Sequence, residues 1–353
     1  ESMRYTERYL ETLKKVTEQI NFGDTLKDRS FLVTGATGMI GSAFTDMLLY
    51  LNREKQLNLH VFAAVRNVNR AEKRFDGFWS SDELSFVPYR AGEEIKAEIR
   101  PDYIIHCAGN AHPTVYAEQP AETLMTNIQG TYGLLEFARN TDSVKRVLYV
   151  SSSEVYGQMP GERLYREGDC GTVDFLSARS CCSSGKRAAE TLCVCFAKEY
   201  GTESVIVRPG HIYGPTMTEQ DSRAASAFLR NAVQGEPILM KSAGLQKRSY
   251  CYVFDCATAM LTVLLKGIAG EAYNISNRDA IVTIRQFAEI LAEEAGTEVI
   301  FEKATDKEAA GYNPMTCSAL DAEKLEALGW TGQYPVREGI GDTLQILESV
   351  REK

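Results

Sequence analysis

One stretch of the chain decides the fold: Phe31-Leu32-Val33-Thr34-Gly35-Ala36-Thr37-Gly38-Met39-Ile40-Gly41-Ser42. It begins with an apolar run that is typical of a buried parallel strand. The run breaks at Gly35 and continues with apolar residues at helical spacing. Glycine recurs at positions 35, 38 and 41, where it allows a tight turn, close approach of the backbone to a pyrophosphate, and close packing of the following helix. Because these glycines lie between a predicted strand and a predicted helix, they indicate a dinucleotide site.

Composition narrows the classes of function. The 353 residues carry a formal net charge of −9, which argues against nucleic acid as a partner. No apolar run approaches the roughly 18 residues of a membrane span, and no signal peptide is visible. The nine cysteines lie mostly in apolar segments, so we expect reduced thiols and a cytoplasmic protein. With four histidines and no Cys/His ligand spacing, we expect no metal site.

Predicted strands alternate with predicted helices over residues 30–215, several of the strands being continuously apolar. This pattern predicts an α/β fold, a Rossmann-type doubly wound parallel sheet with its ligand at the carboxyl ends of the strands. We expect residues 1–29 to hold an amphipathic helix packed on the core, and 251–275 to return to the dinucleotide-binding domain. Residues 216–250 and 276–353 are expected to form a smaller mixed α/β lobe that binds the substrate.

The end of the second predicted strand bears on the choice of dinucleotide. An acidic residue there would bind the ribose hydroxyls of NAD. This chain has Arg66-Asn67 instead. An arginine can accept the 2′-phosphate of NADP or stack on adenine, and it can equally be a solvated loop residue. This position therefore leaves NAD and NADP both open.

Three later segments carry groups suited to catalysis. Ser151–Gly157 follows the fifth predicted strand and supplies hydroxyls and a carboxylate where a substrate is expected. Arg179–Glu190 enters a predicted helix on which positions 182 and 186 lie one turn apart on one face. Arg208–Pro215 follows the sixth strand.

Together with the glycine stretch, these segments resemble the extended short-chain dehydrogenase/reductase family, the NAD-dependent epimerases and dehydratases that modify nucleotide sugars. The resemblance covers nearly the whole chain and includes Asn127 and Arg248. It implies NAD rather than NADP, because members that recycle the cofactor internally generally use NAD. It also implies a UDP-linked nucleotide sugar as substrate, and a homodimer joined through two long helices, here about 121–139 and 180–200.

The family pattern implies a role for each matching position. In the family, the nicotinamide oxidises a sugar carbon, usually C4. A tyrosine four residues before a lysine takes the hydroxyl proton, and the lysine lowers the phenol pKa from near ~10. The implied catalytic residues are Ser152, Glu154, Cys182 and Lys186. The implied cofactor contacts are Gly35, Thr37, Gly38, Met39, Ile40, Arg66, Cys107, Ala108, Gly109, Asn127, Val150, Lys186, Pro209 and His211. The implied substrate contacts are Ser153, His211, Arg223 and Arg248.

The chain departs from the pattern at Cys182, where the family has tyrosine. A thiol has a pKa near ~8.5, which we expect Lys186 to lower. Three interpretations stay open. In the first, the chain is an active-site variant. In the second, it is a natural enzyme whose base is Cys182, a water, Glu154 or Tyr156. In the third, it is a catalytically silent protein that only binds sugar nucleotides. A plain core cysteine is the further alternative.

The residues around Glu154 favour one branch of the family. Dehydratases carry an Asp-Glu pair where this chain has Ser153-Glu154, and simple epimerases usually lack the glutamate. The pattern resembles the UDP-glucuronate decarboxylase branch, as do 217–223 and 248–250. We therefore predict a UDP-glucuronate decarboxylase-like reaction through a 4-keto intermediate, with 4-epimerisation and 4,6-dehydration as alternatives. His211 replaces an asparagine that is common in the sugar-nucleotide site.

Overall fold

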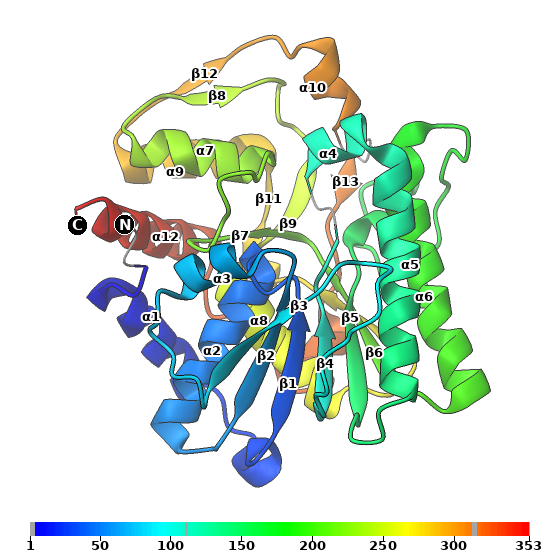
Figure 1. The fold of residues 1–353 in the computed structure, drawn as a ribbon. Helices are drawn as coiled ribbons and strands as arrows, with labels where there is room; N and C mark the ends of the chain where they lie inside the picture. Colours follow the sequence, from blue (N-terminus) through cyan, green and yellow to red (C-terminus); the bar gives the residue numbers. More distant parts are fainter. Residues whose placement is uncertain (1–3, 110–111, 313–315, 353) are drawn as a thin grey trace.

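The computed structural model describes residues 4–109, 112–312 and 316–352. Its centre is a sheet of seven parallel strands in the spatial order β10-β6-β5-β4-β1-β2-β3 (Figure 1). These strands are β1 Ser30–Thr34, β2 His60–Val65, β3 Leu84–Pro88, β4 Tyr103–His106, β5 Arg146–Val150, β6 Ser204–Pro209 and β10 Ala272–Ile275. The strand order reverses between β1 and β4, which is the switch point where open α/β sheets bind ligands. The predicted doubly wound parallel sheet is confirmed.

Both faces of this sheet are buried, as the continuously apolar strands predict. Along β1, Phe31 and Val33 face one core and Leu32 faces the other, and all three are fully buried. Helices α2 (Met39–Lys55), α3 (Val68–Phe75) and α8 (Val253–Lys266) contribute to the first core. Helices α5 (Pro120–Arg139) and α6 (Cys181–Tyr200) cover the second face, where Figure 1 shows them side by side. Different helices therefore cover the two faces of the sheet, α2, α3 and α8 on one and α5 and α6 on the other.

The N-terminal helix α1 (Glu7–Glu18) packs outside α2. Its Tyr9 hydroxyl donates to the buried Asp46 carboxylate at 2.6 Å, and Arg74 forms an ion pair with the same carboxylate at 2.8 Å. The buried charge of Asp46 is thus paired, which ties α1 to the core. A 3-10 turn, η1 (Gly23–Leu26), leads from α1 toward β1.

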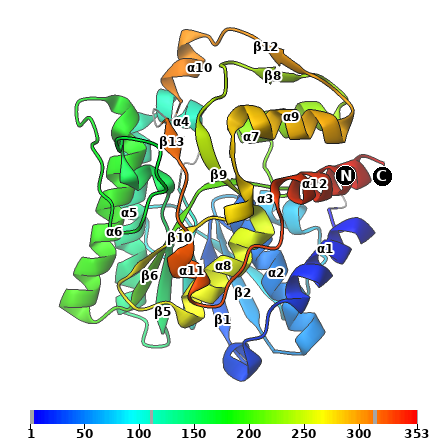
Figure 2. The same ribbon diagram turned by 180° about the vertical axis from the view of Figure 1, so that it is seen from behind.

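The smaller elements gather above the carboxyl ends of the large sheet, as both views show (Figures 1 and 2). A small sheet contains β7 His211–Tyr213, β9 Lys247–Tyr252, β11 Ile281–Thr283 and β13 Cys317–Ser318, and a parallel pair contains β8 Ile238–Met240 and β12 Val299–Phe301. The helices there are α7 Ala224–Val233, α9 Ile284–Ala295, α10 Asp306–Ala310 and α12 Val336–Arg351, with a 3-10 turn η4 at Arg278–Ala280. The short helix α11 (Glu323–Glu326) instead packs beside β10 of the large sheet (Figure 2). Between these smaller elements the chain returns to the large sheet to form α8 and β10.

Within the described ranges, no helix is both long enough and apolar enough to cross a membrane.

Candidate functional site

The glycine turn joins β1 to α2 through contacts that only glycine allows. Gly35 has a φ of +64°, and a Cβ there would lie 2.9 Å from the backbone nitrogen of Ala108. A Cβ at Gly41 would lie 2.3 Å from the Gly35 carbonyl oxygen, so the close packing at Gly41 is against the turn itself. Gly38 is the N-cap of α2 and provides no side-chain cap. The first N–H groups of α2 are therefore left for an anion.

The ends of β1 and β4 are joined by uncharged groups. Thr34 Oγ1 accepts from the backbone N–H of Ala108 at 3.1 Å and lies 2.7 Å from His106 Nδ1. Burial, together with the charge of Lys186, lowers the pKa of His106 to about 3, so this imidazole is neutral at physiological pH. Burial raises the pKa of the neighbouring Cys107 thiol to about 12. The switch point is thus held by hydrogen bonds between neutral side chains and backbone.

The structure brings the predicted cofactor residues to one edge of the sheet. Each follows the carboxyl end of a neighbouring strand, or lies in a helix above it. They are Arg66 after β2; Thr37, Met39 and Ile40 after β1; Cys107, Ala108 and Gly109 after β4; Val150 at the end of β5; and Pro209 and His211 in β6 and β7. Arg66 is exposed to solvent. This is the edge at which a dinucleotide is expected.

Asn127 and Lys186 reach this edge from α5 and α6. The Lys186 ammonium donates to the Val150 carbonyl at 3.0 Å, and burial lowers its pKa. Asn127 Nδ2 donates to a carbonyl in its own helix, whereas Asn127 Oδ1 is buried with no hydrogen-bond partner in the part of the chain that the structure describes. A Cβ on Gly109 would lie 3.5 Å from that oxygen and 3.8 Å from Lys186 Nζ. An unpaired buried acceptor beside an ammonium fits a ligand that brings hydroxyl groups, such as the ribose of a dinucleotide.

Cys182 lies on the same face of α6 but is closed off from solvent. Its side chain is 2% exposed and packs in a small cluster with Tyr116, Cys181 and Leu124. Burial raises the pKa of its thiol to about 12, and the Glu154 charge acts in the same direction. Lys186 and a hydrogen bond from Tyr116 act in the opposite direction but are outweighed. Lys186 thus lowers the pKa of this thiol, as expected, but desolvation is the larger effect and the net pKa is raised.

Glu154 lies in the 3-10 turn η2 (Ser153–Tyr156), directly after β5. Arg179, in the 3-10 turn η3 (Ala178–Ser180), donates from its two terminal nitrogens to both carboxylate oxygens at 2.9 and 2.7 Å. Ser152 is the N-cap of η2, and its hydroxyl accepts from the backbone N–H of Glu154 at 3.2 Å. Ser153 is buried. A two-point ion pair thus fixes the orientation of the carboxylate within electrostatic reach of Cys182 on α6.

The other predicted substrate residues are a histidine and two arginines, and they lie in the smaller lobe above the large sheet. His211 begins β7, Arg248 lies in β9, and Arg223 is the N-cap of α7. Burial, followed by the charges of Arg248 and Arg223, lowers the pKa of His211. Arg223 is paired with the buried Asp221 at 2.6 Å, and burial lowers the pKa of Arg248. His211 is therefore within electrostatic reach of both arginines, and these two cations suit an anionic substrate.

The comparisons with known proteins agree with this geometry. The model of the NAD dependent epimerase/dehydratase family matches residues 31–276. The chain belongs to this family. UDP-glucuronic acid decarboxylase 1 of Xenopus tropicalis is 30% identical over 331 residues, which cover 92% of this chain and 74% of that protein. UDP-glucuronic acid decarboxylase 6 of Arabidopsis thaliana is 30% identical over 311 residues, which cover 88% of this chain and 86% of that protein.

Solved structures support the same epimerase/dehydratase fold. The UDP-glucose 4-epimerase of Thermotoga maritima, solved with UDP-glucose, gives a TM-score of 0.75 at 24% identity and covers 91% of this chain and 99% of its own. The dTDP-glucose 4,6-dehydratase of Streptomyces venezuelae, solved with NAD, gives a TM-score of 0.77 at 24% identity and covers 92% and 98%. At these identities the similarity establishes the fold alone.

One part of this epimerase/dehydratase site was not predicted from the sequence. The short helix α4 (Pro113–Glu118) lies between β4 and α5 and carries Tyr116 to the Cys182 cluster. Its start is tied to the loop before α7: His112 Nδ1 lies 3.2 Å from Asp221 Oδ1, and the Thr114 and Ser222 hydroxyls are 2.9 Å apart. The available signal was a proline at the first position of α4 and again of α5.

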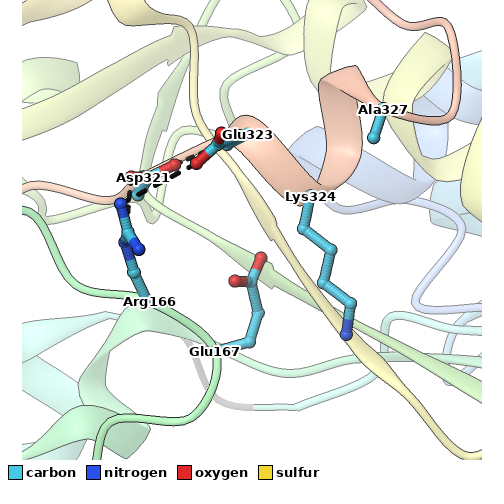
Figure 3. Close-up of a pocket in the computed structure, with 6 residues that line it drawn as sticks. All are labelled: Arg166, Glu167, Asp321, Glu323, Lys324 and Ala327. Atoms are coloured by element: carbon cyan, nitrogen blue, oxygen red, sulfur yellow. Dashed lines mark hydrogen bonds and ion pairs between the residues drawn. The ribbon is translucent and has the colours of Figure 1, made fainter.

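One hollow elsewhere on the surface of the described residues has its charged side chains already engaged. Figure 3 shows this hollow of about 290 Å³, lined by Arg166, Glu167, Asp321, Glu323, Lys324 and Ala327. Its charged side chains are engaged with one another or with the backbone: Arg166 pairs with Asp321 at 3.4 Å, and Lys324 donates to a carbonyl of β10. Among the residues that the structure describes, no group of three or more His, Cys, Asp or Glu side chains could hold a metal ion.

Proposed function

We propose that this chain is an NAD-dependent nucleotide-sugar enzyme that decarboxylates a UDP-linked uronate through a 4-keto intermediate. The observation that carries the proposal is the position of the Glu154 carboxylate. Glu154 directly follows β5, both its oxygens are held by Arg179, and its charge acts on Lys186. The curated relatives at 30% identity are decarboxylases of this kind. They are aligned over most of their length, which supports a shared reaction class.

The cofactor is proposed to lie along the strand ends from Arg66 to Val150. The uncapped N-terminus of α2 faces its pyrophosphate, and Asn127 Oδ1 and Lys186 Nζ hold its ribose. When bound, NAD supplies reversible oxidation of the sugar at C4. The chain's own part is to hold that cofactor against the substrate and to move the protons.

The remaining site residues have distinct proposed roles. Ser152 hydrogen-bonds the reacting sugar oxygen, and the Lys186 ammonium stabilises negative charge on it. Glu154 orients the ring or exchanges a proton at C5, Ser153 lines the sugar site, and Arg223, Arg248 and His211 bind the carboxylate or the diphosphate. Cys182 is protonated at neutral pH and therefore does not act as the base in the free protein.

Product analysis tests this proposal. We expect purified protein with UDP-glucuronate to yield a UDP-pentose, seen by proton NMR and mass spectrometry, and Glu154→Gln to lower that rate without weakening UDP binding. A product that keeps C6 would show an epimerase instead. If UDP sugars bind and none is changed, the chain is instead a catalytically silent binding protein. The burial of the Cys182 thiol favours this alternative.

We further propose that the chain is a cytoplasmic homodimer joined through α5 and α6. Large apolar side chains are exposed on both helices, namely Met125 (41%), Tyr132 (51%), Val194 (51%) and Tyr200 (47%). The many unpaired cysteines suit a reducing compartment. Light scattering after size exclusion would give twice the monomer mass, and Tyr132→Glu would return it to the monomer.

A further inference from the structure

Tyr116 brings a phenol to the position where the chain lacks one on α6. Its ring packs against Cys182 and Cys181 in the buried cluster, and the Tyr116 hydroxyl and the Cys182 thiol are close enough to shift each other's pKa. The Arg179 guanidinium lies 4.9 Å from the centre of the Tyr116 ring while also holding Glu154. Arg179 therefore fixes Tyr116 and Glu154 together beside the thiol.

The surroundings decide the protonation state of this phenol. Burial raises the pKa of Tyr116 well above its usual value, and Cys182 and Glu154 raise it further, against a smaller opposing effect of Arg179. Tyr116 is thus a neutral hydroxyl at every physiological pH. A buried, protonated acid is suited to donating a hydrogen bond to an oxygen that becomes negative during a reaction, rather than to accepting a proton.

The helix that carries Tyr116 is linked at its start to the loop before α7. Its N-cap His112 contacts Asp221 at 3.2 Å, and Thr114 contacts Ser222, so α4 is linked to the loop that also holds Arg223. Leu124, in α5, completes the packing around the ring. The phenol is therefore held by α4, α5 and α6 and by a loop of the smaller lobe, which gives its hydroxyl a defined position.

We infer that Tyr116 is a catalytic hydrogen-bond donor to the C4 oxygen of the sugar, taking a part of the role that position 182 has lost. The inference rests on the proposed function. In the 4-keto uronate, the bond from C5 to the carboxylate breaks and CO₂ leaves. The electron pair forms a C4=C5 double bond, and the carbonyl pair moves to the C4 oxygen. The Tyr116 hydroxyl keeps its proton and donates a hydrogen bond to that oxygen, which stabilises the enolate charge. Water then protonates C5 as the C4 carbonyl re-forms, and the hydroxide left behind combines with the released CO₂ as bicarbonate.

Tyr116→Phe tests the inference, because it removes the hydroxyl and keeps the ring that Arg179 and Cys182 contact. Tyr50→Phe is the matched control, since Tyr50 lies in α2, is partly exposed and is outside the Tyr116 cluster. Three quantities are measured for each variant: UDP affinity by calorimetry, product formation from UDP-glucuronate by NMR, and reduced nicotinamide by absorbance. We expect Tyr116→Phe to lower turnover roughly 10²-fold. UDP affinity stays unchanged, and reduced nicotinamide accumulates because the oxidised sugar waits for decarboxylation.

Two results would overturn the inference while leaving the proposed function in place. One is turnover of Tyr116→Phe equal to that of Tyr50→Phe. The other is loss of UDP binding together with turnover, and no accumulation of reduced nicotinamide, which marks a structural role. If the unmodified protein itself changes no UDP sugar, the proposed function fails first, and the inference fails with it.

Discussion

The glycine turn and the start of α6 are two ends of one site, and they tolerate change very differently. At the turn, an added Cβ would lie 2.3 Å from a backbone oxygen at Gly41 and 2.9 Å from a backbone nitrogen at Gly35. At α6, Cys182 lies among side chains, and its packing with Tyr116 leaves the helix regular from Cys181 to Tyr200. Backbone contacts therefore constrain the cofactor end strictly, whereas the proton-transfer end can change its chemistry within the same fold.

The largest effect is expected for Gly41→Ala. The new methyl group would overlap the Gly35 carbonyl, so the turn must shift, and we expect unfolding to become easier by about 3 kcal/mol. NAD binding should be lost as well. Gly133→Ala is the control, because nothing lies within 4 Å of a Cβ at this α5 glycine. Urea denaturation and NAD titration measure both; equal behaviour of the two variants would contradict the account of the turn.

Lys186→Met is expected to act on the chemistry rather than on the fold. Methionine suits the buried position but removes the ammonium, so turnover should fall roughly 10²–10³-fold while the unfolding midpoint changes little. Lys198→Met, at an exposed position of the same helix, is the control. Steady-state product formation gives the comparison, and a Lys186→Met rate close to that of Lys198→Met would remove Lys186 from the catalytic residues.

His106 should make the strand junction sensitive to acid. Its folded pKa of about 3 lies below the unfolded value of ~6.5, so the unfolded chain binds a proton first and stability falls as the pH drops below 6.5. Between pH 6.5 and 5 the loss is about 2 kcal/mol. In urea titrations, the free energy of unfolding of His106→Asn should therefore fall less steeply as the pH is lowered. His60→Asn, at a partly exposed position, should keep the steeper fall. Parallel slopes for the unmodified protein and His106→Asn would rule out this origin.

Arg66→Ala is expected to give the smallest effect. The side chain is exposed at the end of β2, so NAD affinity should change by less than about 1 kcal/mol. If Arg66 contacts a 2′-phosphate, NADP affinity falls more than NAD affinity. Arg100→Ala, a 68% exposed arginine at the amino ends of the strands, is the control for net charge. Equal losses for both nucleotides would assign Arg66 to the solvated loop.

The sequence predicts most of the fold because its signals are local. The β1 apolar run and the glycine spacing each lie within a dozen residues, and the parallel sheet follows from the strand–helix alternation. The arrangement of the site is harder to predict from the sequence, because it depends on contacts between residues far apart in the chain. Arg179 meets Glu154 across 25 positions, and Tyr116 meets Cys182 across 66, so only the folded chain brings them together. The raised thiol pKa of Cys182 likewise depends on burial, which a sequence does not state.

The most direct test of the central claim is release of carbon from UDP-glucuronate labelled with ¹³C at C6. We predict that the unmodified protein and Gly133→Ala release labelled CO₂ and leave a UDP-pentose, whereas Gly41→Ala does neither. The account would be contradicted if the purified, NAD-supplied protein bound UDP-glucuronate and the label stayed in the nucleotide sugar.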